Sequence, residues 1–283
     1  MPAVYLSINA RKRILDILVY LFLGLGSIIY ILPFLWQVST SLKIQSQLFV
    51  FPPKWIPQPV AWENYPRGLR MVPFARYFLN SSIVTTLSVI GRLVSCPIVA
   101  YSFARLKWPG RNFFFVVTLA TLMIPFQVTM IPLFITFRKL GWIDTFKPLI
   151  IPCFFGSAFF IFLLRQFFLT IPEELSDAAK IDGCSHFGIF WRIMLPLTKP
   201  ALAVVAIFEF LWTWNDFIGP LIFLNSEEKY TVAIGLQQFF GAHGADWGAL
   251  MATSTIVTFP VILLFFFTQR YFIEGITLTG IKA

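Results

Sequence analysis

The chain has 283 residues, of which 58% are hydrophobic, 18% are aromatic and only 12% are charged. A soluble domain usually carries about a quarter charged residues, so the composition argues against a water-soluble enzyme and indicates a protein of the lipid bilayer. The net charge of +9 does not indicate nucleic-acid binding, because Lys and Arg occur in small clusters between apolar runs instead of along one stripe.

Six apolar segments reach the length of about 20 residues that a transmembrane helix needs. They are residues 14–37, 78–104, 112–137, 148–169, 200–224 and 249–273. We therefore expect an all-α, polytopic membrane protein with six transmembrane helices. The first segment is long enough to span the bilayer and no small-residue cleavage site follows it, so we expect it to be retained and not removed as a signal peptide.

The spans divide the chain into three parts. Residues 1–77 are expected to form an N-terminal tail, the first transmembrane helix and an extracytoplasmic loop. Residues 78–273 form the core transmembrane domain, with a cytoplasmic loop at 170–200, and residues 274–283 form a cytoplasmic C-terminal tail. With the N-terminus inside, twelve basic residues face the cytoplasm and nine face outside. This bias favours cytoplasmic N- and C-termini.

The sequence carries no sign of catalytic chemistry. It has no Walker-type phosphate loop, no paired metal ligands and no glycine-rich nucleotide fingerprint. The histidines, His186 and His243, have no nucleophile and carboxylate at a suitable spacing, and Cys96, Cys153 and Cys184 are too far apart for a metal site. We therefore predict no catalytic residue, no metal ligand and no bound cofactor, and we expect the cysteines to serve as small packing residues.

The loop TIPEELSDAAKIDGCSHFGIFWRIMLPLTKP, residues 170–200, predicts two short helices around a turn. Thr170 and Glu173 have the spacing of a capping box, and Pro172 suits the first turn of a helix. Asp182 and Gly183 should end that helix.

Ser185 can cap the second helix, which Leu195-Pro196 should end. Its apolar residues recur at helical spacing and predict one stripe: Phe187, Phe190, Trp191 and Met194. On the first helix, Ala178 and Ala179 offer a small surface that another protein could approach closely. The alternative is an amphipathic helix pair that only lies on the membrane.

The spacing within this loop resembles the permeases of binding-protein-dependent ABC importers. Their cytoplasmic signature runs Glu-Ala-Ala, three residues, Gly, nine residues, then Ile-x-Leu-Pro. The matching residues here are Asp177, Ala178, Ala179, Gly183, Ile193, Leu195 and Pro196. Asp177 replaces the family's Glu, which keeps the charge but shortens the side chain, and Glu174 lies one turn earlier as a substitute.

The resemblance implies that this loop docks into a separate ATPase subunit and carries its motion into the membrane. The residues implied in coupling are Glu174, Asp177, Ala178, Ala179, Asp182, Gly183 and Pro196. ATP and Mg would be bound by the ATPase and not by this chain.

Three further passages resemble the carbohydrate group of this family, in particular the second permease of maltose-type importers. They are LWTWNDFIGPLIF at 211–223, the segment 246–283, and SLK at 41–43. The resemblance implies the type I ABC importer permease fold in a bacterial plasma (inner) membrane, and import of a sugar or sugar-like solute, with glycerol phosphates and oligosaccharides both open. The implied partners are a homologous permease in a heterodimer, two ATPase subunits, an extracytoplasmic solute-binding protein and membrane lipid, with no nucleic acid. The tail after Glu274 would reach the ATPase.

Three charged residues inside predicted spans need a partner, because charge is costly there: Arg92 in span two, and Glu209 and Asp216 in span five, which are seven apart and share one helical face. At about 1.5 Å per residue from the cytoplasmic ends, Arg92 and Glu209 reach comparable depth, so we hypothesise an ion pair. The alternative is that backbone carbonyls or water neutralise each one separately.

Polar and aromatic residues in spans three and five are candidates for a solute path. They are Gln127, Thr129, Trp212, Trp214, Asn215 and Asp216. Aromatic faces can stack on sugar rings, and amide or carboxylate groups can bind hydroxyls. For the tryptophans, the alternative is an aromatic belt at the membrane surface.

Two other functions fit a membrane protein of this composition. An ion-coupled secondary carrier would use Glu209 or Asp216 as its titrating group, but the sequence shows no convincing internal duplication of the kind such carriers often have. A membrane enzyme or scaffold would need a catalytic constellation, and the sequence indicates none.

Overall fold

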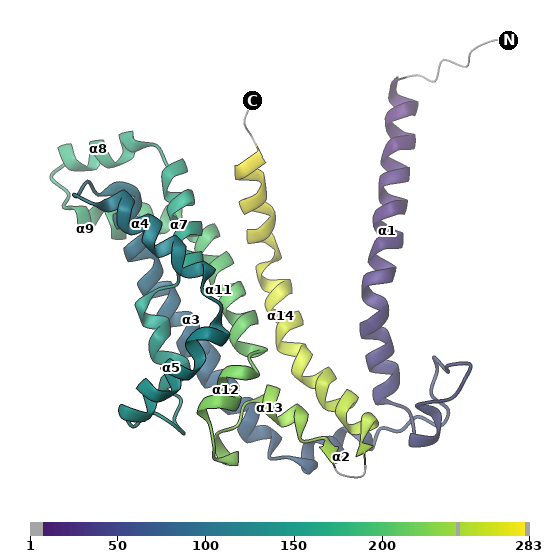
Figure 1. Ribbon diagram of the computed structural model, residues 1–283. Coiled ribbons are helices and arrows are strands. Elements are labelled where there is room, and N and C mark those ends of the chain that lie inside the picture. Colours follow the sequence, from purple (N-terminus) through teal and green to yellow (C-terminus); the bar gives the residue numbers. More distant parts are fainter. Residues whose placement is uncertain (1–7, 242–243, 281–283) are drawn as a thin grey trace. The chain divides into compact units, whose positions relative to one another are not determined.

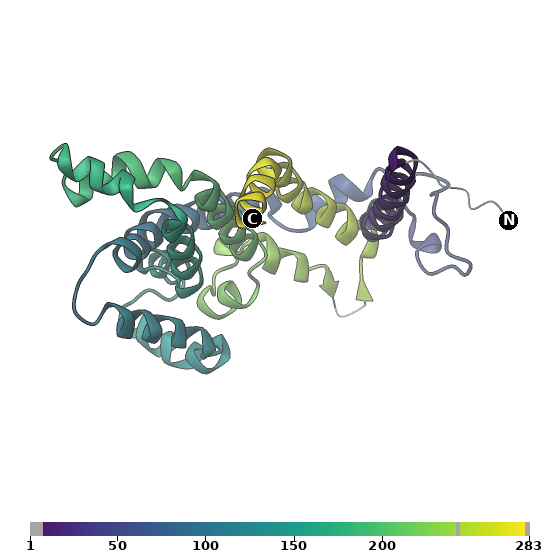
Figure 2. The same ribbon diagram turned by 90° about the horizontal axis from the view of Figure 1, so that it is seen from above.

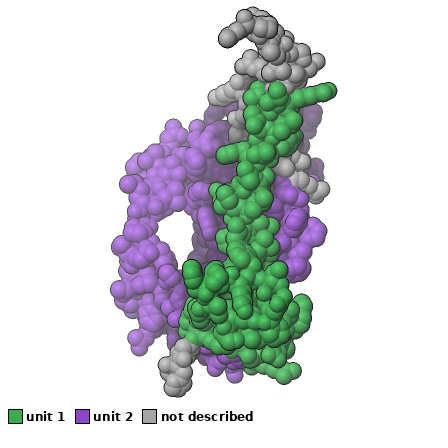
Figure 3. All heavy atoms as spheres, turned by 90° about the vertical axis from the view of Figure 1, so that its right-hand side faces the viewer, with its two compact units in different colours: residues 1–70, 239–256 green, residues 71–238, 257–283 purple. Residues whose placement is uncertain are grey.

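The computed structural model describes residues 8–241 and 244–280, which form two compact units (Figure 3). One unit contains the described residues up to Arg70 together with Phe239–Ile256, and the other contains Met71–Gln238 and the described chain from Val257 onward. Apart from one pair of two-residue strands, the regular structure of the described residues is helical. The predicted all-α class is therefore confirmed.

The first unit is built around one long helix and its connection to a short one. Its elements, in chain order, are α1 (Ile8–Ser41), the 3-10 turn η1 (Gln45–Gln47), α2 (Asn64–Met71, whose last residue falls in the second unit), β1 (Phe240–Gly241), β2 (Gly244–Ala245) and the first ten residues of α14 (Trp247–Gly280). The strands are antiparallel, with Phe240 opposite Ala245. The apolar side chains of α1 are exposed along most of the helix, as expected for a helix covered by lipid or by another membrane protein.

Close backbone contacts hold the first unit together. Asn64 donates hydrogen bonds to the carbonyls of Ser41 and Lys43, at 2.9 Å each. A Cβ atom on Gly68 would lie 2.4 Å from the Thr253 hydroxyl, so α2 can pack on α14 only through glycine. The predicted SLK segment is therefore a structural element of this unit.

The second unit contains the remaining elements (Figure 1). They are α3 (Phe74–Arg105), α4 (Arg111–Ala120), η2 (Thr121–Met123), α5 (Phe126–Lys139), α6 (Lys147–Ile150), η3 (Ile151–Phe155), α7 (Ala158–Thr170), α8 (Glu173–Ile181), α9 (His186–Ile189), a π-helical turn η4 (Phe190–Met194), α10 (Leu195–Leu197), α11 (Lys199–Trp214), α12 (Ile218–Phe223), η5 (Glu227–Lys229), α13 (Val232–Gln237) and the rest of α14. The end of the predicted tail, residues 281–283, and the first seven residues of the chain lie outside the described residues.

Helices α3, α7 and α11 lie side by side and form the core of the second unit (Figures 1 and 2). Lipid is as apolar as a leucine side chain, so membrane helices associate mainly through close packing and hydrogen bonds. The face of α3 at the centre is accordingly lined by small buried residues: Ser95, Cys96, Ala100 and Ala104. Large side chains from α7, including Phe160, Leu164 and Phe168, fill the space against them.

The helices provide four to six membrane spans. Four are long and apolar enough by themselves: Lys12–Ser41, Phe74–Arg105, Lys147–Thr170 and Trp247–Gln269. Two further spans result if each bent pair counts as one: Arg111–Met123 with Phe126–Lys139, bent by 98°, and His186–Leu197 with Lys199–Trp214, bent by 75°. Pro125 causes the first bend, because it cannot donate to a preceding helical turn and it forces Ile124 out of the helical region.

Besides window 112–137, two other predicted spans are not continuous helices. Window 148–169 is interrupted at Gly156, whose φ of 88° lies outside the range that most residues adopt. Window 200–224 contains α11 and α12, which are separated by residues 215–217. The apolar count of a window does not detect these breaks.

Asp144 ties two loops of the second unit together. Its carboxylate accepts hydrogen bonds from the Asn225 and Ser226 backbone N–H groups and from Lys229 Nζ at 2.8 Å, while its backbone adopts a φ of 59°. The Lys229 ammonium, with Ser226, holds the pKa of the Asp144 carboxyl well below its usual range.

This arrangement predicts a specific sensitivity to acid. A depressed folded-state pKa contributes stability above the unfolded value of about 3.9, and that stability is lost as pH falls through the folded pKa. Asp144→Asn keeps a side chain that tolerates positive φ but removes the titration. We expect the midpoint of thermal unfolding to fall less between pH 7 and pH 3 in this variant than in the unaltered protein. Equal falls in the two proteins would contradict the assignment.

Candidate functional site

The turn between α8 and α9 is fixed by backbone hydrogen bonds. The N–H of Cys184 donates to the Ala179 carbonyl at 2.8 Å, and the N–H of Gly183 donates to the Lys180 carbonyl at 3.0 Å. Gly183 has a φ of 81°. Together these features form a Schellman motif, which ends α8 in a defined geometry. The predicted break at Asp182-Gly183 is confirmed.

The start of the first helix differs from the prediction. Thr170 is the last residue of α7, its hydroxyl donates to the Phe167 carbonyl, and it does not cap α8. Pro172 occupies the capping position without a side-chain hydrogen bond. The capping box is therefore wrong, because Pro172 forces Ile171 into an extended conformation one residue after Thr170.

The second helix begins as predicted but continues differently. Ser185 caps α9 by accepting the Gly188 N–H at 3.2 Å. Leu195-Pro196 does not end the helical segment, which continues through the turn η4 and α10 to Leu197. The predicted single apolar stripe is wrong: Phe190 and Met194 are buried, whereas Phe187 and Trp191 are exposed and stack on each other with ring centroids 6.4 Å apart.

The exposed face of α8 combines small, apolar and acidic side chains. Ala178 is exposed, whereas its neighbour Ala179 is only 6% exposed and packs into the core, so the alanine pair does not form one surface. Leu175 and Ile181 are also exposed, the latter by 87%. Other residues of the predicted coupling set are exposed around them: Glu174, Asp177, Asp182, Gly183 and Pro196. Asp177 pairs with Lys180 at 2.8 Å.

Two buried side chains of α3 hold this segment in place. Tyr101 packs against Phe168 and Phe190, with ring centroids 5.9 and 5.2 Å away, and its hydroxyl lies 3.4 Å from the His186 carbonyl. Arg105, whose side chain is 6% exposed, donates to the Phe168 and Ile171 carbonyls. These carbonyls lie at the end of α7, where Pro172 cannot donate the next helical N–H and the Phe168 carbonyl otherwise accepts the Ile171 N–H at 3.3 Å. The segment is therefore attached to α3 at both of its helices.

Arg92 and Glu209 lie together between α3 and α11. Arg92 Nε is 3.4 Å from a Glu209 oxygen, and their side chains are only 18% and 6% exposed. Arg92 also donates to the Gly156 carbonyl, at the break that precedes α7. Cys153 donates from Sγ to Glu209 at 3.4 Å. The arginine therefore has both of the hypothesised partners, a carboxylate and a backbone carbonyl.

A cavity of about 540 Å³ opens beside this pair within the second unit. Among the predicted path residues, Trp212 and Asp216 line it, together with the Arg92–Glu209 pair. Thr213 on α11 lines it as well, and no sequence pattern indicated this residue. Trp212 is half exposed and stacks on Phe160 at 5.1 Å. Asp216 accepts the Gly219 N–H at 3.0 Å and so also caps the start of α12.

The other predicted path residues do not line this cavity. Trp214 is 3% exposed, and its indole N–H donates to the Val257 carbonyl at 3.1 Å. Asn215 is exposed and donates to the Leu211 carbonyl. On α5, Gln127 is exposed and Thr129 is half-buried. Trp214 thus serves packing within the bundle, and the cavity contains only part of the predicted set.

Comparisons with known proteins agree with this architecture. The sequence profile of the family described as the binding-protein-dependent transport system inner membrane component matches residues 96–277. The arabinooligosaccharides transport system permease AraQ of Bacillus subtilis is 35% identical over 93% of this chain and 94% of its own length. The sn-glycerol-3-phosphate transport system permease UgpE of Yersinia pestis is 31% identical, over 94% and 97% respectively.

A solved structure shows the same fold. It is the crystal structure of a bacterial ABC transporter involved in the import of the acidic polysaccharide alginate, which matches with a TM-score of 0.80 and 24% identity over 95% of this chain and 100% of the other. This chain belongs to the family of inner membrane components of binding-protein-dependent transport systems. It is a multi-pass inner membrane protein and not an enzyme, and the family implies an ATPase and a solute-binding protein as partners.

Proposed function

We propose that the chain forms one half of the membrane pathway of an ATP-driven importer for a sugar or sugar-like solute. The observation that carries this proposal is the rigid segment at 170–200, which presents an exposed small and apolar face although it is anchored to α3. The printed names of the relatives, for arabinooligosaccharides and for sn-glycerol 3-phosphate, support a carbohydrate or a sugar-like solute.

The exposed face of α8 is the proposed docking surface for the ATPase. Ala178 allows close approach, and the acidic side chains Glu174, Asp177 and Asp182 surround it. Gly183 fixes the turn, Ala179 packs behind the surface in the core, and Pro196 lies exposed in α10. Nucleotide chemistry, with ATP and Mg, belongs to two copies of that ATPase, and this chain binds no cofactor. The proposal also includes the division of the chain into residues 1–77, 78–273 and 274–283, with both termini in the cytoplasm.

The cavity beside Arg92 and Glu209 is the proposed part of the solute path. Trp212 can stack on a sugar ring, and Asp216 can accept a hydroxyl hydrogen bond with the oxygen that does not cap α12. The rest of the path includes Gln127, Thr129 and Asn215. A homologous permease covers these three side chains in a heterodimer. A solute-binding protein delivers the solute from outside, and the pathway opens alternately to each side.

An ion-coupled carrier is less well supported by the same residues. Such a carrier needs a carboxylate that is free to titrate. Glu209 is paired with Arg92, and Asp216 caps α12. Both carboxylates therefore already have a partner within the protein.

The test is co-purification with the ATPase encoded beside this chain. We expect Ala178→Arg to abolish retention of the ATPase in detergent, because a large cation fills the approach surface. Ala75→Arg makes the same change at an exposed alanine near the start of α3, at the far end of that helix from Arg105, and should retain the ATPase. Retention by both variants would reject the docking surface, and no retention by the unaltered chain would reject the importer.

A further inference from the structure

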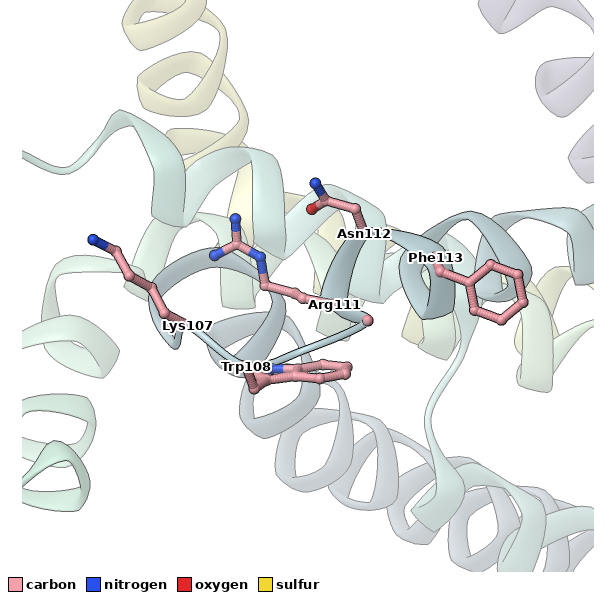
Figure 4. Close-up of a pocket in the computed structure, with 6 residues that line it drawn as sticks. Lys107, Trp108, Arg111, Asn112 and Phe113 are labelled. Atoms are coloured by element: carbon pink, nitrogen blue, oxygen red, sulfur yellow. The ribbon is translucent and has the colours of Figure 1, made fainter.

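The loop that joins α3 to α4 forms a second, basic pocket of about 280 Å³ (Figure 4). Lys107, Trp108, Gly110, Arg111, Asn112 and Phe113 line it. The loop lies where the span ending at Arg105 meets the span beginning at Arg111, which is the boundary between membrane and water. Figure 4 shows the polar ends of Lys107, Arg111 and Asn112 on one side of the loop and the Trp108 ring on the other.

Positive charge in this region is not neutralised by the protein. Among the residues that the structure describes, neither Lys107 nor Arg111 takes part in an ion pair within 4.0 Å. Arg165 is close enough to Arg111 for their charges to interact, so a third cation adds to the field. Asp177 is close enough to Lys107 for their charges to interact, but its carboxylate already accepts a hydrogen bond from Lys180. Like charges held together without a counter-charge favour binding of an anion.

The loop is stiff enough to hold these cations in place. Trp108 donates from its indole N–H to the Ser102 hydroxyl at 3.2 Å and packs between Phe103 and Phe114, with ring centroids 5.8 and 6.0 Å away. Arg111 donates to the Leu106 carbonyl at 3.0 Å. The pocket is thus preformed, and binding does not require the loop to order.

The helix that follows adds both polar and apolar contacts. At the start of α4, the backbone N–H groups of Asn112 and Phe113 have no hydrogen bond to another described residue, so they are available to an oxyanion. The Phe113 side chain is 66% exposed, and Val116 and Val117 continue the apolar surface away from the loop. Polar groups therefore lie at the loop, and apolar side chains follow along α4. A ligand whose phosphate is followed by a hydrocarbon chain matches this order of polar and apolar groups.

We propose that this pocket binds the phosphate of an anionic phospholipid, with Lys107 and Arg111 on the headgroup and Phe113 against the upper acyl chain. Basic pockets between transmembrane helices near the headgroup level select anionic lipids in this way. The proposal concerns a lipid site and does not depend on the solute that the protein transports.

The experiment measures lipid binding to the full chain in detergent by native mass spectrometry. The probes are short-chain phosphatidylglycerol, short-chain phosphatidylcholine and inorganic phosphate. Lys107→Gln/Arg111→Gln removes two cations from the pocket. We expect about thirtyfold weaker binding of phosphatidylglycerol, since each cation lost near an anionic headgroup costs about fivefold in affinity. Phosphatidylcholine should bind weakly to both proteins.

Two controls separate charge from structure. Lys107→Arg/Arg111→Lys keeps both charges and should bind nearly as the unaltered chain does. Arg138→Gln/Lys139→Gln removes the same charge from exposed positions at the end of α5 and should have no effect. If the double glutamine variant does not fold, Lys107→Gln alone changes an exposed side chain and should weaken binding about fivefold.

Three outcomes would overturn the proposal. One is equal binding of phosphatidylglycerol to the unaltered chain and to the folded glutamine variants. Another is equal affinity for phosphatidylcholine, which would leave no role for the pocket's excess charge. The third is displacement of the lipid by inorganic phosphate at equal concentration, which would make free phosphate the ligand.

Discussion

Replacing either Arg92 or Glu209 with glutamine is expected to cost the folded protein about 3–5 kcal/mol, because each change leaves the opposite charge buried without its partner. Both side chains are mostly shielded from solvent, and Arg92 also holds the Gly156 carbonyl at the break before α7. Replacing both residues should cost less than the sum of the single losses. Unfolding in detergent by heat and denaturant measures the difference.

The matched control is the Arg76–Glu228 pair, which lies 3.8 Å apart with side chains 57% and 77% exposed. The same glutamine substitutions there should change the free energy of unfolding by less than about 1 kcal/mol, and the double change should be close to additive. Additive losses at Arg92 and Glu209 as well would show that each charge is stabilised independently.

Arg105→Gln is expected to separate ATPase binding from transport. The arginine anchors the end of α7 and the start of α8 to α3, so its loss should leave the exposed face of α8 present but loosely attached. We expect the ATPase to co-purify, while solute-stimulated ATP hydrolysis and uptake fall at least tenfold. Since hydrogen bonds from charged groups contribute about 1.5–3 kcal/mol each, stability should also fall by about 3 kcal/mol.

Glu173→Gln provides the control for this prediction. Glu173 pairs with Arg105 at 3.8 Å, but its side chain is 81% exposed, so the pair adds little stability. Uptake by this variant should be near that of the unaltered chain. Normal coupling in Arg105→Gln would mean that the aromatic contacts of Tyr101 are enough to hold the segment.

The sequence predicted the features that depend on composition and spacing. Apolar windows located the helices because a span must satisfy its backbone within lipid. The break at Gly183 followed from glycine's freedom to adopt positive φ, and Ser185 followed from its suitability as a cap. Counting rise per residue placed Arg92 and Glu209 at similar depth, and the structure has them 3.4 Å apart.

Other features depended on contacts between distant segments. The apolar pattern assumed one helical period, whereas the π-helical turn at Phe190–Met194 changes which residues share a face. Ala178 and Ala179 looked equivalent in the sequence, but only the second packs into the buried core. The cavity was only partly predicted, because Trp212 and Trp214 look alike in the sequence. Trp212 stacks on Phe160 and remains half exposed, whereas Trp214 packs on Phe78 and is hydrogen-bonded to α14.

The tight turn between α8 and α9 also gives Cys184 a distinct chemical environment. Cys96 and Cys153 are buried within the bundle, whereas Cys184 is partly open to solvent beside Gly183. A thiol-directed spin label or fluorophore can therefore be placed at the segment proposed to meet the ATPase without engineering a new cysteine. The natural sequence thus provides an attachment point for measuring how far that turn moves during a transport cycle.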